Sequence, residues 1–328
     1  MSDTTSAGIL SIGAYVPERV VTNDDLAKIV DTNDEWIFQR TGIRQRRFAR
    51  PDEFTSDMAI AATRQALERA EMKPTDVDYI IVATASPDNT FPNTACWVQQ
   101  GLQMGDIPAL DISTACAGFV YAIELGAALV NTDSYRNVLV IGSEKLSSVT
   151  NFTDRGSCIL FADGAGAAVV TRTPGRGTVL CSRNGARFDY DALNIAAGGS
   201  RMPASHETVE KNLHTIALKG RAVYKFAVQK FMEMADEACK RGGISPDQVA
   251  LVVPHQANVN IIESAMGRVG IGMDRVLINL DRFGNTSSAS IPIALDEALR
   301  DGRIKRGDYV LLLAFGGGLS WGYNLIRW

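Results

Sequence analysis

A strand-to-helix turn is predicted at Ala109-Leu110-Asp111-Ile112-Ser113-Thr114-Ala115-Cys116-Ala117-Gly118-Phe119. The apolar residues at 109–112 indicate a short strand, and the apolar pattern that continues to about Val130 indicates a helix. Upstream, a helical pattern at about 55–71 precedes a buried strand at 77–84, and a further strand is predicted at 138–141. Helices of about a dozen residues between short apolar strands are typical of βαβ units, so we predict an α/β protein.

The second half of the chain repeats this plan, with strand-like runs at 249–254, 276–280 and 309–315. The offsets between matched positions are nearly constant: 167 residues from Pro87 to Pro254, 169 from Cys116 to Asn285 and 171 from Leu139 to Val310. Any α/β chain shows strands at loosely similar spacing, but we interpret this agreement as the duplication of a whole domain. The Pro/Gly-rich turn at 173–177 is the predicted boundary, which divides the chain into residues 1–175 and 176–328.

The composition is that of an ordinary globular protein, with 46% hydrophobic and 21% charged residues in a chain of 328. Lys and Arg number 33 against 37 Asp and Glu, so nucleic acid and anionic membranes are not expected as general partners. The N-terminal residues lack the basic segment of a targeting peptide. No uncharged run reaches the roughly 20 residues that span a bilayer. We therefore expect a soluble cytoplasmic protein.

Metal and dinucleotide sites are not expected either. The five cysteines are odd in number and never spaced as Cys-x-x-Cys, which argues against a disulfide framework and a structural zinc site. The segment Gly164-Ala165-Gly166 is followed by strand-like residues rather than by a helix, which argues against a dinucleotide cofactor.

Cys116 is the first candidate for chemistry, because it lies where the predicted strand meets the predicted helix. At such a turn the sulfur faces free backbone N–H groups and the positive end of the helix dipole, so we expect a thiol pKa below the usual value. The small neighbours Ala115, Ala117 and Gly118 leave room for a substrate. A buried structural cysteine is the competing interpretation.

His255 and Asn285 are the corresponding candidates in the second half. His255, one of three histidines, follows the strand at 249–254, and Asn285 falls at the position that the repeat assigns to Cys116. Taken singly, His255 could be a packed core residue and Asn285 a turn residue. Taken together, all three residues follow strand ends, where open α/β sheets bind ligands. They also combine a thiolate, an imidazole and an amide donor.

Two further segments are candidates for binding anions. The triplet Gly316-Gly317-Gly318 follows a strand, and its N–H groups could hold an oxyanion, although a flexible turn has the same sequence. Four arginines crowd the region after Trp36, namely Arg40, Arg44, Arg46 and Arg47. They suit a phosphorylated ligand with a flat base, or equally a solvated surface strand.

These motifs resemble those of the β-ketoacyl-[acyl-carrier-protein] synthase III family, the initiating condensing enzymes of fatty acid synthesis. The resemblance extends over essentially the whole chain and rests on residues 34–36, 40–44, 115–119, 161–166, 254–258, 284–287 and 315–318. It implies the thiolase fold, in which two duplicated α/β halves form a five-layered αβαβα sandwich, and a homodimer. It also implies acyl-CoA and acyl carrier protein as partners, with no cofactor and no metal.

The resemblance assigns a role to each candidate residue. Cys116 would take the acyl group from acyl-CoA, and His255 and Asn285 would hydrogen-bond the malonyl thioester while carbon dioxide leaves. The N–H groups of Cys116 and Gly317 would form the oxyanion hole. The implied coenzyme A contacts are Thr32, Trp36, Arg40, Arg155 and Asn258, and Phe91 would bound the acyl pocket of the other subunit. Asn260 stands where the family often has an arginine for carrier-protein docking, so we assign that docking to Arg221, Lys225 and Arg268.

Several alternatives stay open. A paralogue in secondary metabolism could prime a polyketide or quinolone pathway, or pass the acyl group to an oxygen or nitrogen nucleophile. Chalcone-synthase-like enzymes share the three residues but are usually longer. Biosynthetic thiolases would have a histidine at the position of Asn285. A thiol hydrolase would release the acid without a malonyl substrate. A non-catalytic acyl-binding module would need no thiolate. The acyl chain of the primer is not predicted.

Overall fold

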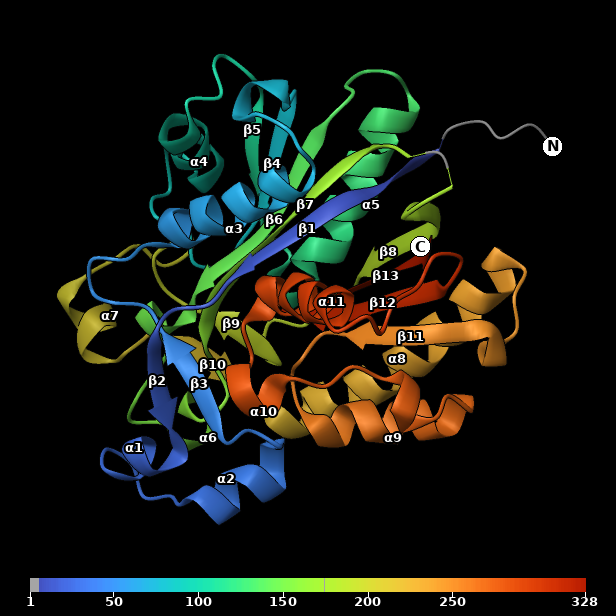
Figure 1. The fold of residues 1–328 in the computed structure, drawn as a ribbon. Helices are drawn as coiled ribbons and strands as arrows, with labels where there is room; N and C mark the ends of the chain where they lie inside the picture. Colours follow the sequence, from blue (N-terminus) through green and yellow to red (C-terminus); the bar gives the residue numbers. More distant parts are fainter. Residues whose placement is uncertain (1–5, 174) are drawn as a thin grey trace.

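The computed structural model describes residues 6–173 and 175–328. The main sheet of the described residues has nine strands. Five of them belong to the first half of the chain: β1 (Ala7–Tyr15), β4 (Tyr79–Ala83), β5 (Ala109–Ile112), β6 (Val138–Lys145) and β7 (Asp163–Arg172). Four belong to the second half: β8 (Thr178–Ala186), β11 (Val249–Pro254), β12 (Tyr309–Gly316) and β13 (Ser320–Arg327). They are hydrogen-bonded in the order β11-β12-β13-β8-β1-β7-β6-β4-β5 (Figure 1). A single register pair, Gly8 with Thr178, links β1 to β8 among the described residues, so the sheet divides there into two halves.

The two halves repeat one pairing pattern. In the first half β4 pairs parallel with β5 and β6, and β7 pairs antiparallel with β6 and β1. In the second half β11 pairs parallel with β12, and β13 pairs antiparallel with β12 and β8. The internal duplication is therefore confirmed. The boundary at 175/176 stays a prediction; it falls in the connection between β7 and β8, of which Pro174 lies outside the described residues, as do residues 1–5 of the first predicted domain.

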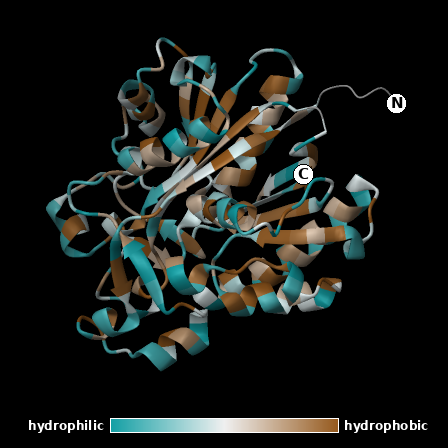
Figure 2. Ribbon diagram, viewed as in Figure 1, coloured by the Kyte–Doolittle hydropathy of each residue, from teal (hydrophilic) through white to brown (hydrophobic). Residues whose placement is uncertain are grey.

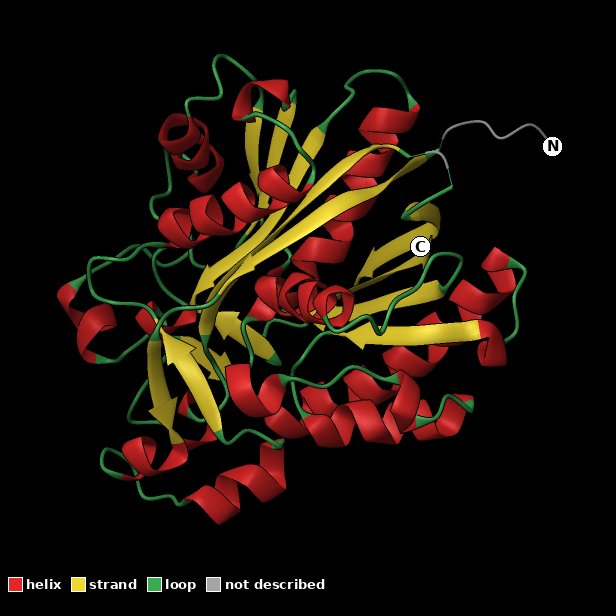
Figure 3. Cartoon of the chain, viewed as in Figure 1, coloured by secondary structure: helices red, strands yellow, loops and turns green. Residues whose placement is uncertain are grey.

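Helices separate and cover the two halves (Figures 1 and 3). The outer helices are α3 (Thr55–Arg69) and α4 (Thr94–Leu102) on the first half, and α8 (Gly220–Gly242) with α9 (Val259–Val269) on the second. Between the halves lie α5 (Gly118–Asn131) and α11 (Ser290–Arg300), which contact strands of both. This is the five-layered αβαβα sandwich that the resemblance implies.

The sequence of α5 follows from its central place. Phe119, Val120, Ile123 and Val130 are fully buried in the cluster that fills the space between the sheet halves. Because strands cover this helix on more than one side, it is apolar nearly all round rather than along one stripe. Figure 2 shows the same contrast over the whole chain, brown along the strands and teal over the outer loops.

Shorter elements complete the fold. Two small sheets pair β2 (Arg19–Thr22) with β3 (Gln45–Phe48) and β9 (Leu193–Ile195) with β10 (Ile216–Leu218). The short helices are α1 (Asn23–Ala27), α2 (Asp34–Thr41), α6 (Arg155–Cys158), α7 (His206–Glu210) and α10 (Leu280–Phe283). No helix within residues 6–173 and 175–328 combines the length and the apolar composition that a membrane span requires.

One predicted strand, at 276–280, is wrong. Val276 makes only an isolated parallel bridge to Val252, at the place that β5 takes in the first half. The side chain of Gln256 accounts for the difference: its Nε2 donates to the Leu277 carbonyl at 3.0 Å and its Oε1 accepts from the Asn279 N–H at 3.0 Å. A side chain thus satisfies backbone groups that a neighbouring strand would otherwise pair, and apolar spacing does not reveal this.

Candidate active site

Cys116 lies in the short 3₁₀ turn η2 (Ala115–Ala117), between β5 and α5. The chain bends sharply there because Ala115 has a φ of 46°, in the left-handed region. The C-terminal end of β12 packs directly against this turn. A Cβ built on Gly316 would lie 2.6 Å from the backbone N of Cys116, so only glycine fits at 316. Two backbone segments therefore approach each other closely at the sulfur.

A turn of the same kind, η6 (Ser287–Ala289), precedes α11. Ser287 has a φ of 48°, as Ala115 does in η2, and α11 begins at Ser290 as α5 begins at Gly118. By this geometry the counterpart of Cys116 is Ser288, so the assignment of Asn285 to that position is wrong by three residues. The nearly constant offset between the strands of the two halves does not show where their loops differ in length by a few residues. It therefore cannot align single residues within those loops.

Two cavities meet at Cys116. One, of about 110 Å³, is lined by Cys116, His255 and Asn285 together with residues of α8 and α9. The other, of about 320 Å³, is lined by Cys116 and Gly317 and by mainly apolar residues, namely Ala85, Leu146, Val149, Phe161, Leu193, Ile195 and Ile216. The structure thus brings the three predicted catalytic residues to one cavity, and a second, mainly apolar cavity shares the cysteine with it.

His255 is buried, with 1% of its surface exposed. Its Nδ1 lies 2.7 Å from Ser290 Oγ, and its ring packs edge-on against Phe315 at 5.6 Å between centroids. Burial lowers the pKa of His255 to about 3, so the imidazole is neutral near pH 7. No described residue bonds to Nε2, which leaves that atom for a ligand in the cavity.

Asn285 is oriented by the turn that follows it. Its side-chain oxygen accepts the Ser287 N–H at 2.9 Å, and its backbone pairs with Leu160 and Ala162, both at 2.9 Å. Because the oxygen is engaged, the amide NH₂ is the part left to bind a ligand, and no described residue accepts a hydrogen bond from it. Asn285 therefore supplies the cavity with a neutral donor.

The expected low thiol pKa of Cys116 is wrong for this closed site. Burial raises the pKa of Cys116 to about 12, and nearby Glu144 raises it further, while a hydrogen bond from Ser287 works in the opposite direction. A thiolate loses its hydration when it is enclosed by protein, and this cost exceeds the stabilisation by its hydrogen bonds. The free site therefore holds a neutral thiol, which must lose its proton when it reacts.

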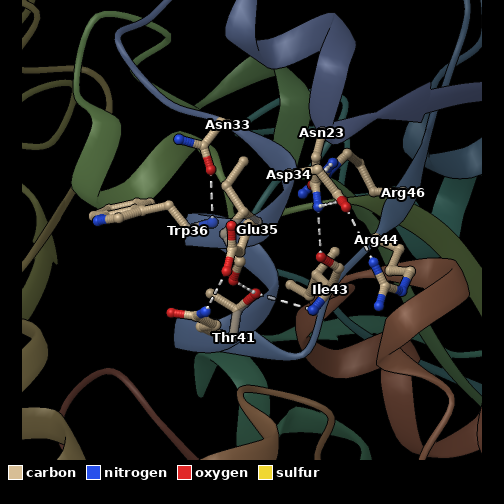
Figure 4. Close-up of polar contacts among 11 residues, drawn as sticks. Asn23, Asn33, Asp34, Glu35, Trp36, Thr41, Ile43, Arg44 and Arg46 are labelled. Carbon is tan, nitrogen blue, oxygen red and sulfur yellow. Dashed lines mark hydrogen bonds and ion pairs between the residues drawn. The ribbon is translucent and has the colours of Figure 1, made fainter.

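Near Trp36 two of the four clustered arginines, Arg44 and Arg46, make contacts within the protein (Figure 4). Arg46 is fully buried, and its guanidinium donates to Asn23 Oδ1 at 2.8 Å and to the Ile159 carbonyl at 2.7 Å. Arg44 pairs with Asp34 at 3.0 Å. Arg46 is therefore a structural residue that a phosphorylated ligand cannot reach, whereas Arg44 stays exposed in a surface ion pair.

The predicted coenzyme A contacts lie together beside α2. The guanidinium carbons of Arg40 and Arg155 lie 4.6 Å and 4.7 Å from the Trp36 ring centroid. The Thr32 hydroxyl is buried without a hydrogen-bond partner in the described protein. Asn258, which also lines the cavity at Cys116, donates to the Arg40 carbonyl at 2.7 Å. Asn258 therefore links the contacts around Trp36 with the lining of the cavity at Cys116.

The structure does not gather all of the residues predicted for carrier-protein docking. Arg221 and Lys225 are exposed on the first turns of α8, beside Tyr224, which lines the cavity at Cys116. Arg268 lies in the last turn of α9, roughly 15 Å along that helix from Asn258, and borders a different cavity.

Asn260, which departs from the family pattern, has a structural contact. Its side chain donates to the carbonyls of Gln39 and Arg40 at 3.3 and 3.1 Å, which ties α9 to the end of α2.

Phe91 is 85% exposed and borders neither cavity of its own chain. Three residues that sequence reasoning missed are Glu144, Ser287 and Ser290, all buried around the catalytic turns. The one signal in the sequence was an acid, Glu144, two residues after the apolar run at 138–142. Within the described ranges, no group of three or more His, Cys, Asp or Glu residues could hold a metal ion.

Comparison with known proteins agrees with this geometry. Residues 110–186 match the family model for 3-oxoacyl-[acyl-carrier-protein (ACP)] synthase III, and residues 239–328 match the model for its C-terminal part. The chain is 52% identical to the β-ketoacyl-[acyl-carrier-protein] synthase III of Caldanaerobacter subterraneus subsp. tengcongensis, over 100% of this chain and 99% of that protein.

Solved structures of other proteins are also similar to this chain. The crystal structure of 3-oxoacyl-[acyl-carrier-protein] synthase III from Aquifex aeolicus VF5 superposes with a TM-score of 0.92 at 43% identity, covering 98% of this chain and 100% of that one. The priming β-ketosynthase of the R1128 polyketide pathway superposes at 0.90 with 33% identity, covering 98% and 96%. The chain therefore belongs to the 3-oxoacyl-[acyl-carrier-protein] synthase III family of condensing enzymes.

Proposed function

We propose that this chain carries out the initiating condensation of fatty acid synthesis with Cys116, His255 and Asn285 as its catalytic residues. The observation that carries the proposal is their convergence on one cavity, where the Cys116 thiol lies with an imidazole nitrogen and an amide NH₂ that no described residue bonds. Relatives that are named β-ketoacyl-[acyl-carrier-protein] synthase III and match over nearly the full chain support the overall reaction.

In the first step the Cys116 sulfur attacks the thioester carbonyl of an acyl-CoA. The bond between the acyl carbon and the coenzyme A sulfur breaks, and the thiol proton ends on that leaving sulfur, so one thioester replaces another without a cofactor. We assign the stabilisation of the oxyanion to the N–H groups of Cys116 and Gly317.

In the second step malonyl carrier protein replaces coenzyme A. His255 Nε2 and the Asn285 amide donate hydrogen bonds to the malonyl thioester oxygen. The carbon–carboxylate bond then breaks, carbon dioxide leaves, and its electron pair forms the enolate. The enolate carbon attacks acyl-Cys116, and the cysteine leaves as a thiolate and recovers a proton from water. Donors fixed in a buried site are worth more than the same donors in water.

Ser290 supports the tautomer of His255 that this step needs. Its hydroxyl oxygen already accepts a long hydrogen bond from the Gln256 N–H at 3.4 Å. Its proton is then directed to His255 Nδ1, which leaves the imidazole proton on Nε2, facing the malonyl thioester.

The partners follow from surfaces around this cavity. Trp36, with Arg40 and Arg155 over its ring, suits the adenine end of coenzyme A. Arg221 and Lys225 suit an acidic carrier protein at the cavity mouth. The mainly apolar cavity of about 320 Å³ suits the acyl chain. We keep the cytoplasm as the expected location.

A homodimer is supported by the free edge of the sheet. β5 is its outermost strand, and Phe91 and Trp97, which precede it in the chain, are 85% and 44% exposed. An uncovered strand edge beside large apolar side chains is typical of a surface that another chain covers. A second subunit there is consistent with Phe91 closing the acyl pocket of its partner.

One second candidate has an observation in its favour. The 33% identity to the priming ketosynthase of a polyketide pathway is compatible with the same chemistry in secondary metabolism. Intact-protein mass spectrometry separates the cases. We expect one acyl group on Cys116 from an acyl-CoA, discharged by malonyl carrier protein as a ketoacyl product. Discharge to water would identify a hydrolase, discharge to another acceptor would identify a paralogue, and no loading would refute the proposal.

A further inference from the structure

A buried carboxylate lies behind the two catalytic turns. Glu144, at the end of β6, has 0% of its surface exposed. Its Oε2 is bonded by Thr84 Oγ1 at 3.2 Å, the Ala85 N–H at 2.9 Å and Ser86 Oγ at 2.7 Å. Its Oε1 is bonded by Ser288 Oγ at 2.9 Å and the Ser288 N–H at 3.5 Å. All of these partners are neutral, and no described cation pairs with this carboxylate.

A buried acid without a cation is costly, because enclosure removes its water and no opposite charge offsets that loss. Burial accordingly raises the pKa of Glu144, against the hydrogen bonds that lower it. An apolar residue at the end of an apolar strand would avoid this cost. The position of the carboxylate therefore calls for a reason other than stability.

The hydrogen bonds of Glu144 join the two halves of the molecule at the active site. Thr84, Ala85 and Ser86 follow β4 in the first half, whereas Ser288 lies in η6 of the second half. The Ser287 side chain interacts with both Glu144 and Cys116. The carboxylate thus helps to fasten η6 to the frame that carries the cysteine, beside the hydrogen bond from Ser288 Oγ to the Ala83 carbonyl at 2.8 Å.

The same turn orients Asn285. The Ser287 N–H donates to Asn285 Oδ1 at 2.9 Å, so the position of η6 sets the direction of the Asn285 amide. We propose that Glu144 is a positioning residue, which fixes η6 so that Asn285 presents its NH₂ to the malonyl thioester. This inference rests on the function proposed above and adds a residue outside the catalytic set.

The substitution Glu144→Gln tests it with almost no change in volume. Each oxygen of Glu144 accepts one backbone N–H, from Ala85 on one side and Ser288 on the other. A backbone N–H cannot reverse its direction, so the glutamine NH₂ opposes a donor in either orientation. The amide must then pull away from one half of the frame, and η6 shifts.

We expect Glu144→Gln to slow the discharge of pre-acylated enzyme by malonyl carrier protein about 10- to 100-fold. Acylation by acyl-CoA should stay within about threefold of wild type or become faster, because the charge that raises the thiol pKa is removed. Both steps are followed by intact-protein mass spectrometry under single-turnover conditions. Glu124→Gln, the same change at another acid with a burial-raised pKa, is the matched control and should leave both steps unchanged.

The decisive readout is a double-mutant cycle. In an Asn285→Ala background, Glu144→Gln should slow discharge by less than about twofold further, because its effect passes through Asn285. Additive losses, or equal losses in both steps, would overturn the inference.

If Glu144→Gln does not fold, Ser288→Ala removes one contact to the carboxylate and should slow discharge alone, by about threefold. An unchanged discharge rate in Ser288→Ala would also overturn the inference. Normal discharge in Asn285→Ala itself would refute the catalytic assignment, whereas a slow Asn285→Ala with a normal Glu144→Gln would refute only this inference.

Discussion

Two turns of the same shape, η2 in the first half and η6 in the second, begin the two helices between the sheet halves. Each opens on a residue with φ near 47°, Ala115 at 46° and Ser287 at 48°. In η2 the next residue is Cys116, which faces two cavities. In η6 the next residue is Ser288, which contacts the buried Glu144. One backbone geometry therefore holds the proposed nucleophile in one half and a residue that contacts Glu144 in the other.

The largest expected difference between the two turns appears when their matched residues lose their polar atoms. Cys116→Ala should show no acyl loading in intact-protein mass spectra, because no other sulfur reaches both cavities. Its melting temperature should stay close to wild type. Ser288→Ala, the matched change in η6, should load normally. Loading of Cys116→Ala would mean that another residue is the nucleophile.

The next largest effect is expected for His255, which lines the cavity at Cys116. His255→Ala should still load the acyl group but should discharge it to malonyl carrier protein roughly 10²- to 10³-fold more slowly, as for loss of one oxyanion donor. Released carbon dioxide and the mass of the acyl-enzyme report the two steps separately. Rapid carbon dioxide release by this variant would remove His255 from its assigned role.

A smaller effect separates two neighbouring glycines beside η2. Gly316→Ala places a methyl group 2.6 Å from the Cys116 nitrogen, whereas at Gly317 the closest contact is 3.5 Å, with Leu193. We expect Gly316→Ala to slow acylation about tenfold and to destabilise the fold by about 1–3 kcal/mol. Gly317→Ala should change both by much less. Calorimetry and loading rates test this, and equal effects at both positions would contradict the close approach of the two segments.

The smallest expected effect is that of pH on discharge. Burial lowers the pKa of His255 to about 3, so its imidazole stays neutral and discharge should vary less than about twofold between pH 6 and 8. A free histidine near pKa 6.5 would titrate in this range. The folded pKa is the lower one, so the contribution of His255 to stability is present above about pH 6.5 and is lost as pH falls toward 3. A step in the discharge rate near pH 6.5 would show a solvated imidazole.

Much of the fold could be predicted from local patterns. The predicted runs at 109–112 and 249–254 coincide with β5 and β11, and the helix after Cys116 ends at Asn131, close to the predicted Val130. The strand predicted at 276–280 failed because the Gln256 side chain bonds its backbone. The counterpart of Cys116 was misassigned because constant offsets do not follow loops of unequal length. Strand ends and residue types were enough to select Cys116, His255 and Asn285.

By itself the sequence determined which residues we propose for the chemistry, because a cysteine, a histidine and an asparagine after strand ends meet at one edge of an α/β fold. Tertiary structure alone decided the state of those residues. The raised pKa of Cys116, the neutral His255 and the contacts of Glu144 all depend on how completely distant segments exclude water around them. Desolvation is a property of packed three-dimensional surroundings, so it cannot be seen in neighbouring residues along the chain.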